Sequence, residues 1–196
     1  MDTTINELQV IEDTSELTIW NDKSVFDNAW RTAQALATSD IVPVAYQKKP
    51  ANCLIALDMA NRMSLSPMYV MQNLYIVKGN PGWSGQFAIS QLNGSRKFQT
   101  DIRFEFEGQQ GTNDWGCRAW AIDKNGEKLT GTLVNLKMAN GEGWVSKSGS
   151  KWQTMPEQML KYRAATFFIR SYAPELLMGI QLVDEIEDVA PKRKSS

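Results

Sequence analysis

The chain has 196 residues, of which 42% are hydrophobic, and a formal net charge of −1 at pH 7. It contains no histidine and only two cysteines, which excludes Ser–His and Cys–His nucleophilic pairs, histidine-containing zinc sites and four-thiolate sites. No GxxxxGK[ST] or GxGxxG motif occurs, so no loop for nucleotide phosphates is recognisable and no cofactor is expected.

The length favours a single domain with one sizeable core. There is no run of 18 apolar residues and no cationic leader followed by an apolar stretch. Cys53 falls in a helical pattern and Cys117 in a strand pattern, as expected for buried thiols in a reducing compartment. The sequence therefore predicts a cytoplasmic protein that makes no contact with a membrane.

The first half of the chain is predicted to be mainly helical. Apolar residues at helical spacing predict a helix over 25–37, with Ser24 as its N-cap. A second helix is predicted from Pro50 to about Met63, because proline suits the first turn of a helix. Further along, the sequence predicts a short helical turn at 67–73, a strand at 74–77, a turn at 79–82 and a helix at 84–92.

The second half is predicted to contain strands at 101–107, 115–122 and 128–138. The last two flank Asn125-Gly126, the strongest short hairpin signal in the chain. Pro156 opens a helix that runs to Tyr172. This order of elements predicts the α+β class, with helices packed on a small antiparallel β-sheet that contains a β-hairpin.

Charge is segregated along the sequence. Residues 1–22 hold six acidic residues and residues 175–188 hold five, and neither segment contains a cation. Residues 137–170 lie between them and contain six cations and two anions, a net charge of +4. An acidic end can compete within the molecule for a basic groove, although acidic ends are more often only solvated.

The basic segment suits a charged polymer with flat bases. Lysines alternate with tryptophans in GWVSKSGSKW at 143–152, and more cations follow on the predicted 156–172 helix. Lysine and arginine neutralise phosphates, while aromatic faces stack on bases whatever their identity. The alternative is a solvated loop whose tryptophans cap a core, and Trp83 has the same two interpretations. The expected DNA contacts are Lys147, Lys151, Trp152, Lys161, Arg163 and Arg170, with Trp144 as a second stacking candidate and Arg96, Lys97 and Arg118 as further phosphate contacts.

Two arginines on the predicted helix are expected to act together. Arg163 and Arg170 are seven residues apart and so lie near one face, about 10 Å apart by helix rise, where they could straddle a sugar-phosphate backbone. The alternative is that either arginine pairs with an acidic residue nearby.

Alternation in DIRFEFEG places Asp101, Arg103, Glu105 and Glu107 on one face of a strand. A row of carboxylates could hold Mg²⁺ for cleavage of a phosphodiester, although it is more often the solvated face of a half-buried strand.

Three segments resemble one known family when they are taken in order. They are NCLIALDMANRMSLSPMYVMQNLYIVKG at 52–79, GWSGQFAISQLNGSRKF at 82–98, and TMPEQMLKYRAATFFIRSYAPELLMGIQLVDEIED at 154–188. Together they resemble the RecT family of phage single-strand annealing recombinases, over about residues 25–188. The basic helix position of that family maps best onto Arg163, with Lys161 beside it.

The resemblance implies an ATP-independent protein, without covalent catalysis, that binds single-stranded DNA and anneals complementary strands in phage recombination. It implies an annealed duplex intermediate, a homo-oligomeric ring or helical filament, and a bacterial cytoplasm as the setting. A phage exonuclease and the host single-strand-binding protein are candidate partners. The implied organisation is an acidic, flexible segment at 1–22, an annealing domain at 23–188 and a polar tail at 189–196.

Three other functions stay open at this stage. A passive coating protein binds single strands without accelerating pairing, a Mg²⁺-dependent nuclease degrades them, and a phage assembly protein shows no salt-dependent DNA binding.

Overall fold

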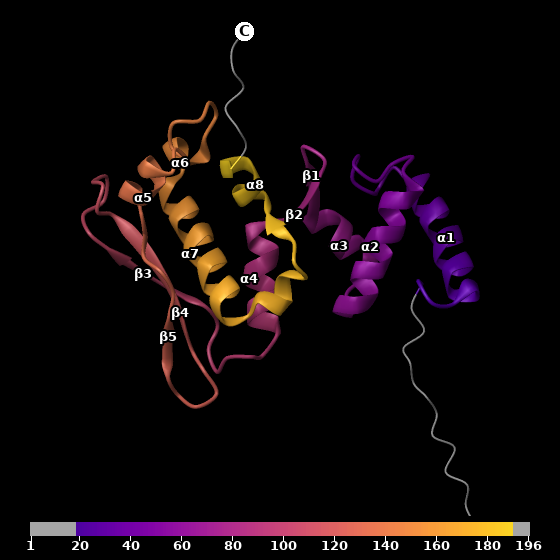
Figure 1. Ribbon diagram of the computed structural model, residues 1–196, viewed down its shortest axis with the longest axis horizontal. Coiled ribbons are helices and arrows are strands. Elements are labelled where there is room, and N and C mark those ends of the chain that lie inside the picture. Colours follow the sequence, from indigo (N-terminus) through magenta and orange to yellow (C-terminus); the bar gives the residue numbers. More distant parts are fainter. Residues whose placement is uncertain (1–18, 190–196) are drawn as a thin grey trace, which may run out of the picture. The chain divides into compact units, whose positions relative to one another are not determined.

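The structure is a computed structural model, and it describes residues 19–189. Within these residues the chain divides after Met71 into two compact units (Figure 1). Helices and small sheets alternate along the chain, which confirms the predicted α+β class. The acidic segment predicted at 1–22 and the polar tail predicted at 189–196 lie almost entirely outside the described residues.

The first unit consists of helices. Helix α1 spans Lys23–Ala37 and α2 spans Pro50–Met63, while α3, Pro67–Asn73, begins in this unit. The prediction of Ser24 as the N-cap of α1 is wrong, because the Asp22 carboxylate caps the helix by accepting the Val25 N–H at 3.0 Å. Ser24 lies in the first turn, and its hydroxyl donates to Asp22.

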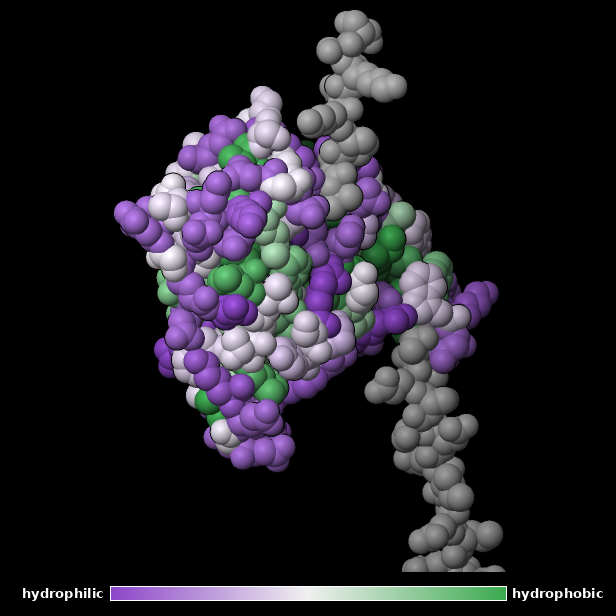
Figure 2. Space-filling view, turned by 60° about the vertical axis from the view of Figure 1, so that its left-hand side comes forward, coloured by the Kyte–Doolittle hydropathy of each residue, from purple (hydrophilic) through white to green (hydrophobic). Residues whose placement is uncertain are grey.

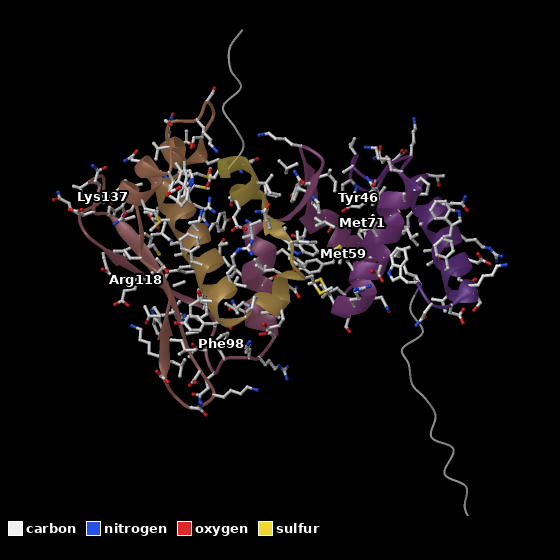
Figure 3. The ribbon with its side chains drawn as sticks, in the orientation of Figure 1. Tyr46, Met59, Met71, Phe98, Arg118 and Lys137 are labelled. Atoms are coloured by element: carbon white, nitrogen blue, oxygen red, sulfur yellow. The ribbon has the colours of Figure 1, made fainter. Side chains whose placement is uncertain are left out.

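Small and apolar side chains form the core of the first unit. Ala33 of α1 and Cys53 and Ala56 of α2 are fully buried, so the two helices pack closely. The core also contains Tyr46, Met59 and Met71 (Figure 3). Burial raises the pKa of the Tyr46 hydroxyl.

The second unit begins with a hairpin. Strand β1, Leu74–Val77, pairs antiparallel with β2, Asn80–Trp83, and β2 pairs parallel with β7, Gln181–Leu182. The turn predicted at 79–82 is misplaced, because the chain reverses at Lys78 and Gly79, which both have positive φ. Glycine suits the second of these positions since it has no Cβ to clash there.

A second sheet contains β3, Arg103–Glu107, β4, Gly116–Ile122, β5, Lys128–Thr130, and β6, Val134–Asn135. The hairpin predicted at Asn125-Gly126 is confirmed and joins β4 to β5. The strand predicted at 128–138 is wrong in its second half. Asn135 accepts the Met138 N–H and caps helix α5, Leu136–Gly141, because an asparagine side chain can satisfy a free N–H of a first turn.

Helix α7, Pro156–Tyr172, is the central helix of the second unit, and it contacts both β4 and helix α4, Gly85–Gly94. Its Leu160, Ala164 and Phe168 are fully buried. Trp83 is a core residue, since it is fully buried, stacks on Phe87 and donates its indole N–H to the Leu177 carbonyl at 3.1 Å. The remaining helices are α6, Lys151–Thr154, the 3₁₀ helix η1, Pro174–Leu177, and α8, Val183–Val189.

Hydrophilic residues cover most of the face of the second unit that Figure 2 shows, with smaller hydrophobic patches between them. Cys53 and Cys117 are buried free thiols, and burial raises the pKa of Cys117 to about 11. None of the helices within residues 19–189 is long and apolar enough to cross a membrane.

Candidate nucleic-acid interface

The Gly/Ser loop at 142–150 folds around a pair of tryptophans. Gly143 and Gly149 both have a φ of +73°, a conformation that glycine adopts without strain. Ser150 donates its hydroxyl to the Trp144 carbonyl at 2.6 Å and caps α6 by accepting the Trp152 N–H. The rings of Trp144 and Trp152 lie 5.3 Å apart and are both buried. Neither tryptophan therefore offers a free face to a base in this conformation. Both cap the core, which is the alternative that the sequence left open.

Arg163 of α7 lies behind this loop rather than on the surface. Its guanidinium carbon lies 4.2 Å from the centre of the Trp144 ring, and the group forms an ion pair with Asp188. It also donates to the Asp184 carbonyl at 3.4 Å. The side chain is only 5% exposed, so a phosphate cannot reach Arg163 unless the Asp188 pair opens.

Helix α8 supplies oxygen acceptors to four cations of the basic segment, carboxylates to three of them and a backbone carbonyl to the fourth. Arg170 forms a bidentate pair with Glu185, with N–O distances of 2.6 and 2.9 Å. Lys147 donates to the Glu187 carbonyl at 2.7 Å. The remaining contacts are Arg163 with Asp188, and Lys151 with Asp184 and Glu187 at 3.8 and 4.0 Å. The two arginines expected to straddle a DNA backbone are thus both paired with α8.

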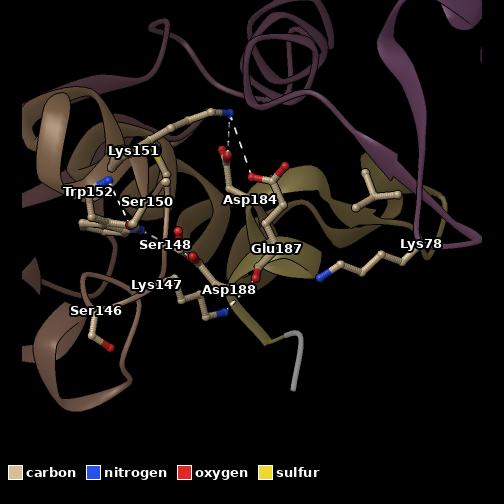
Figure 4. Close-up of a pocket in the computed structure, with 13 residues that line it drawn as sticks. Lys78, Ser146, Lys147, Ser148, Ser150, Lys151, Trp152, Asp184, Glu187 and Asp188 are labelled. Carbon is tan, nitrogen blue, oxygen red and sulfur yellow. Dashed lines mark hydrogen bonds and ion pairs between the residues drawn. The ribbon is translucent and has the colours of Figure 1, made fainter. Parts of the chain in front are cut away.

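A cavity of about 690 Å³ lies between this loop, the β1–β2 hairpin and α8 (Figure 4). Lys147 and Lys151 line it from the loop, and Lys78 extends toward α8 from the hairpin turn. The hydroxyl groups in the lining belong to Ser146, Ser148 and Ser150. The carboxylates, opposite in charge to the lysines, belong to Asp184, Glu187 and Asp188. We call this space the lysine cavity.

The other predicted contacts lie away from the lysine cavity. Lys161 pairs with Glu157 one turn earlier on α7, at 2.8 Å, and Lys97 pairs with Glu175 at 2.6 Å. Arg118 lies on the sheet (Figure 3) and pairs with Glu107 at 2.5 Å. Arg96, next to Lys97, is exposed with a φ of +53°. The structure therefore brings Lys147, Lys151 and Trp152 together at the lysine cavity. The other four predicted contacts, Lys161, Arg96, Lys97 and Arg118, do not line this cavity.

Sequence reasoning missed Lys78 and Tyr75, which come from the hairpin that lines this region. Lys78 lies more than sixty residues before the Gly/Ser loop in the sequence. A count of charges over neighbouring residues therefore could not include it. The only available signal was a cation placed at a tight turn, in VKGNPG.

The strand predicted at 101–107 begins only at Arg103, so Asp101 lies before β3, and the two carboxylates on β3 have cationic partners. Lys128 pairs with Glu105 at 3.0 Å, and Arg118 with Glu107. Between residues 19 and 189, the structure contains no group of three or more acidic, cysteine or histidine side chains arranged to hold a metal ion. The charged side chains at alternate positions of β3 therefore form ion pairs on a solvated face of the sheet.

Asp184, in the first turn of α8, lies close to both cations and other carboxylates. Burial raises the pKa of Asp184, and Glu187 and Asp188 act in the same direction, while Lys151 and Arg163 oppose them. The folded protein therefore binds this proton more tightly than the unfolded chain. Stability is lost as the pH rises from the ordinary aspartate pKa of about 4 through the raised value.

The Asp184→Asn variant tests this assignment. Asparagine does not titrate, so the stability of the variant relative to the wild type should increase with pH across that interval and be constant on either side. The increase should be about 1.4 kcal/mol for each unit by which the pKa is raised. Urea unfolding of both proteins at a series of pH values measures the difference between their stabilities. The contributions of the other titrating groups cancel in this difference. Parallel stability curves would show that Asp184 has an ordinary pKa.

Comparisons with protein-family models, curated proteins and solved structures gave no match.

Proposed function

We propose that the protein binds single-stranded DNA at the lysine cavity and anneals complementary strands without ATP. The observation that carries this proposal is the convergence of Lys78, Lys147 and Lys151 at one cavity, from two segments far apart in the sequence. Three ammonium groups beside serine hydroxyls suit a chain of phosphates, because each lysine that contacts a phosphate releases counterions.

The lining of the cavity favours contacts to the backbone rather than to base edges. Annealing requires that the Watson–Crick edges stay exposed, since pairing itself supplies the sequence specificity. Lysines act as point charges on flexible stems and read no base. The resemblance of residues 25–188 to the RecT family supports the same function, in a bacterial cytoplasm and without covalent catalysis.

Self-association is part of the proposal. A single cavity with three lysines can hold only a few nucleotides, and a row of subunits multiplies the phosphate contacts through effective concentration. We expect a homo-oligomer that lengthens or rearranges when an oligonucleotide is added. Light scattering that reports a strict monomer at micromolar protein, with and without DNA, would count against this part.

The experiment that tests the function is annealing of complementary oligonucleotides, followed by fluorescence without ATP, with Mg²⁺ and with EDTA. The proposal predicts faster pairing with protein than without it in both cases. Binding with an unchanged pairing rate would indicate a passive coating protein. Loss of one strand that EDTA prevents would indicate a nuclease.

A further inference from the structure

A second cavity, of about 390 Å³, adjoins the lysine cavity at Lys151. The two share the lining residues Val77, Lys151, Asp184 and Glu187. The second is lined in addition by Tyr75 and Tyr162 and by Gln86 at the start of α4. Among the shared residues, Lys151 contacts Asp184 and Glu187, and we call this pair of contacts the Lys151 bridge.

Tyr75 gives the second cavity a surface on which a base can stack. Successive side chains of a strand point to opposite faces, so Tyr75 and Val77 share the face of β1 that borders the cavity. Tyr75 is 51% exposed, in contrast to the buried Trp144 and Trp152. Of the two tyrosines that line the second cavity, Tyr75 is exposed and Tyr162 is half-buried, so Tyr75 is the more accessible to a ligand.

The Lys151 bridge is weak. Its N–O distances of 3.8 and 4.0 Å are longer than a hydrogen bond, and the side chains of Lys151 and Glu187 are 50% and 48% exposed. Exposed ion pairs of this kind add little stability, and a phosphate oxygen can replace the carboxylate with a shorter charge-assisted hydrogen bond.

The rest of α8 is held much more firmly. Arg170 binds Glu185 through two hydrogen bonds, Asp188 pairs with the buried Arg163, and Ile186 is buried against β2. The bridge can therefore open by movement of the Lys151 and Glu187 side chains alone, while α8 stays in place.

From this geometry we propose that the two cavities form one groove for single-stranded nucleic acid. Phosphates bind at Lys78, Lys147 and Lys151, a base stacks on Tyr75, and the Glu187 carboxylate occupies a phosphate position until a strand displaces it. The inference rests on the proposed DNA binding and adds to it a base subsite and an internal competitor.

The test measures the affinity of four variants for a fluorescent oligothymidine and for an abasic strand of the same length. Tyr75→Ala should weaken binding to oligothymidine by about 5- to 150-fold, whereas Tyr75→Phe should stay close to the wild type. On the abasic strand, Tyr75→Ala and the wild type should bind equally, because no base is present to stack.

Glu187→Gln should bind both strands about two- to fivefold more tightly than the wild type, since the competing carboxylate is removed. Glu105→Gln is the matched control: it makes the same charge change at a similarly exposed pair, with Lys128 on the other sheet. All four substitutions are at exposed side chains, and thermal unfolding confirms that each variant folds.

Equal losses for Tyr75→Ala on both strands, or equal gains for Glu187→Gln and Glu105→Gln, would overturn the groove while leaving DNA binding intact. A wild-type protein that shows no salt-dependent binding to either strand would reject the proposed function itself, and the groove with it.

Discussion

Replacing Arg163 with alanine is expected to destabilise the fold by about 3–5 kcal/mol, because it leaves a buried carboxylate without its partner. The Asp188 side chain is 8% exposed and pairs with Arg163, which also stacks on Trp144. Urea unfolding of the variant measures the loss. An Arg163→Ala protein as stable as the wild type would contradict the buried pair.

A double variant separates the charge from the packing. Arg163→Met with Asp188→Leu removes both charges and keeps apolar volume, so it should recover most of the lost stability. Arg170→Ala is a useful comparison, because the Arg170 side chain is 37% exposed and its loss should cost less.

Truncating Trp152 to alanine is expected to cost about 3–5 kcal/mol of folding stability. The side chain is 3% exposed, packs against Trp144 with the two rings tilted, and directs its indole N–H to Asp188 at 3.4 Å. Trp152→Phe keeps an aromatic ring in the core and should lose less. Thermal unfolding of the two variants distinguishes a core residue from a DNA contact, because a stacking residue on the surface could be truncated without unfolding the protein.

The elements with strong local signals were predictable. Pro156 and the apolar pattern after it predicted α7, and Asn125-Gly126 predicted the β4–β5 hairpin, because both signals act within a few residues. Helix α5 was missed because it is short and follows β6 directly, so its residues extended the alternation expected of a strand. The capping role of Asn135 became visible only in the structure.

The site was predictable in part, for a similar reason. Charge and composition pointed to Lys147 and Lys151, which line the lysine cavity. The same pattern could not show that Arg163 is buried, because its partner Asp188 is 25 residues further along the chain. Burial of Trp152 likewise depends on packing against Trp144 and α8, and a tryptophan in a Gly/Ser loop looks exposed from sequence alone.

Lysine acetylation with and without an oligonucleotide, read by mass spectrometry, shows whether single-stranded DNA binds at the lysine cavity. Lys124 and Lys128, on the β4–β5 hairpin, serve as references outside the cavity. Binding in the lysine cavity predicts that DNA protects Lys78, Lys147 and Lys151 from acetylation and leaves the two references unchanged. Protection of the references with no protection of the three cavity lysines would contradict it.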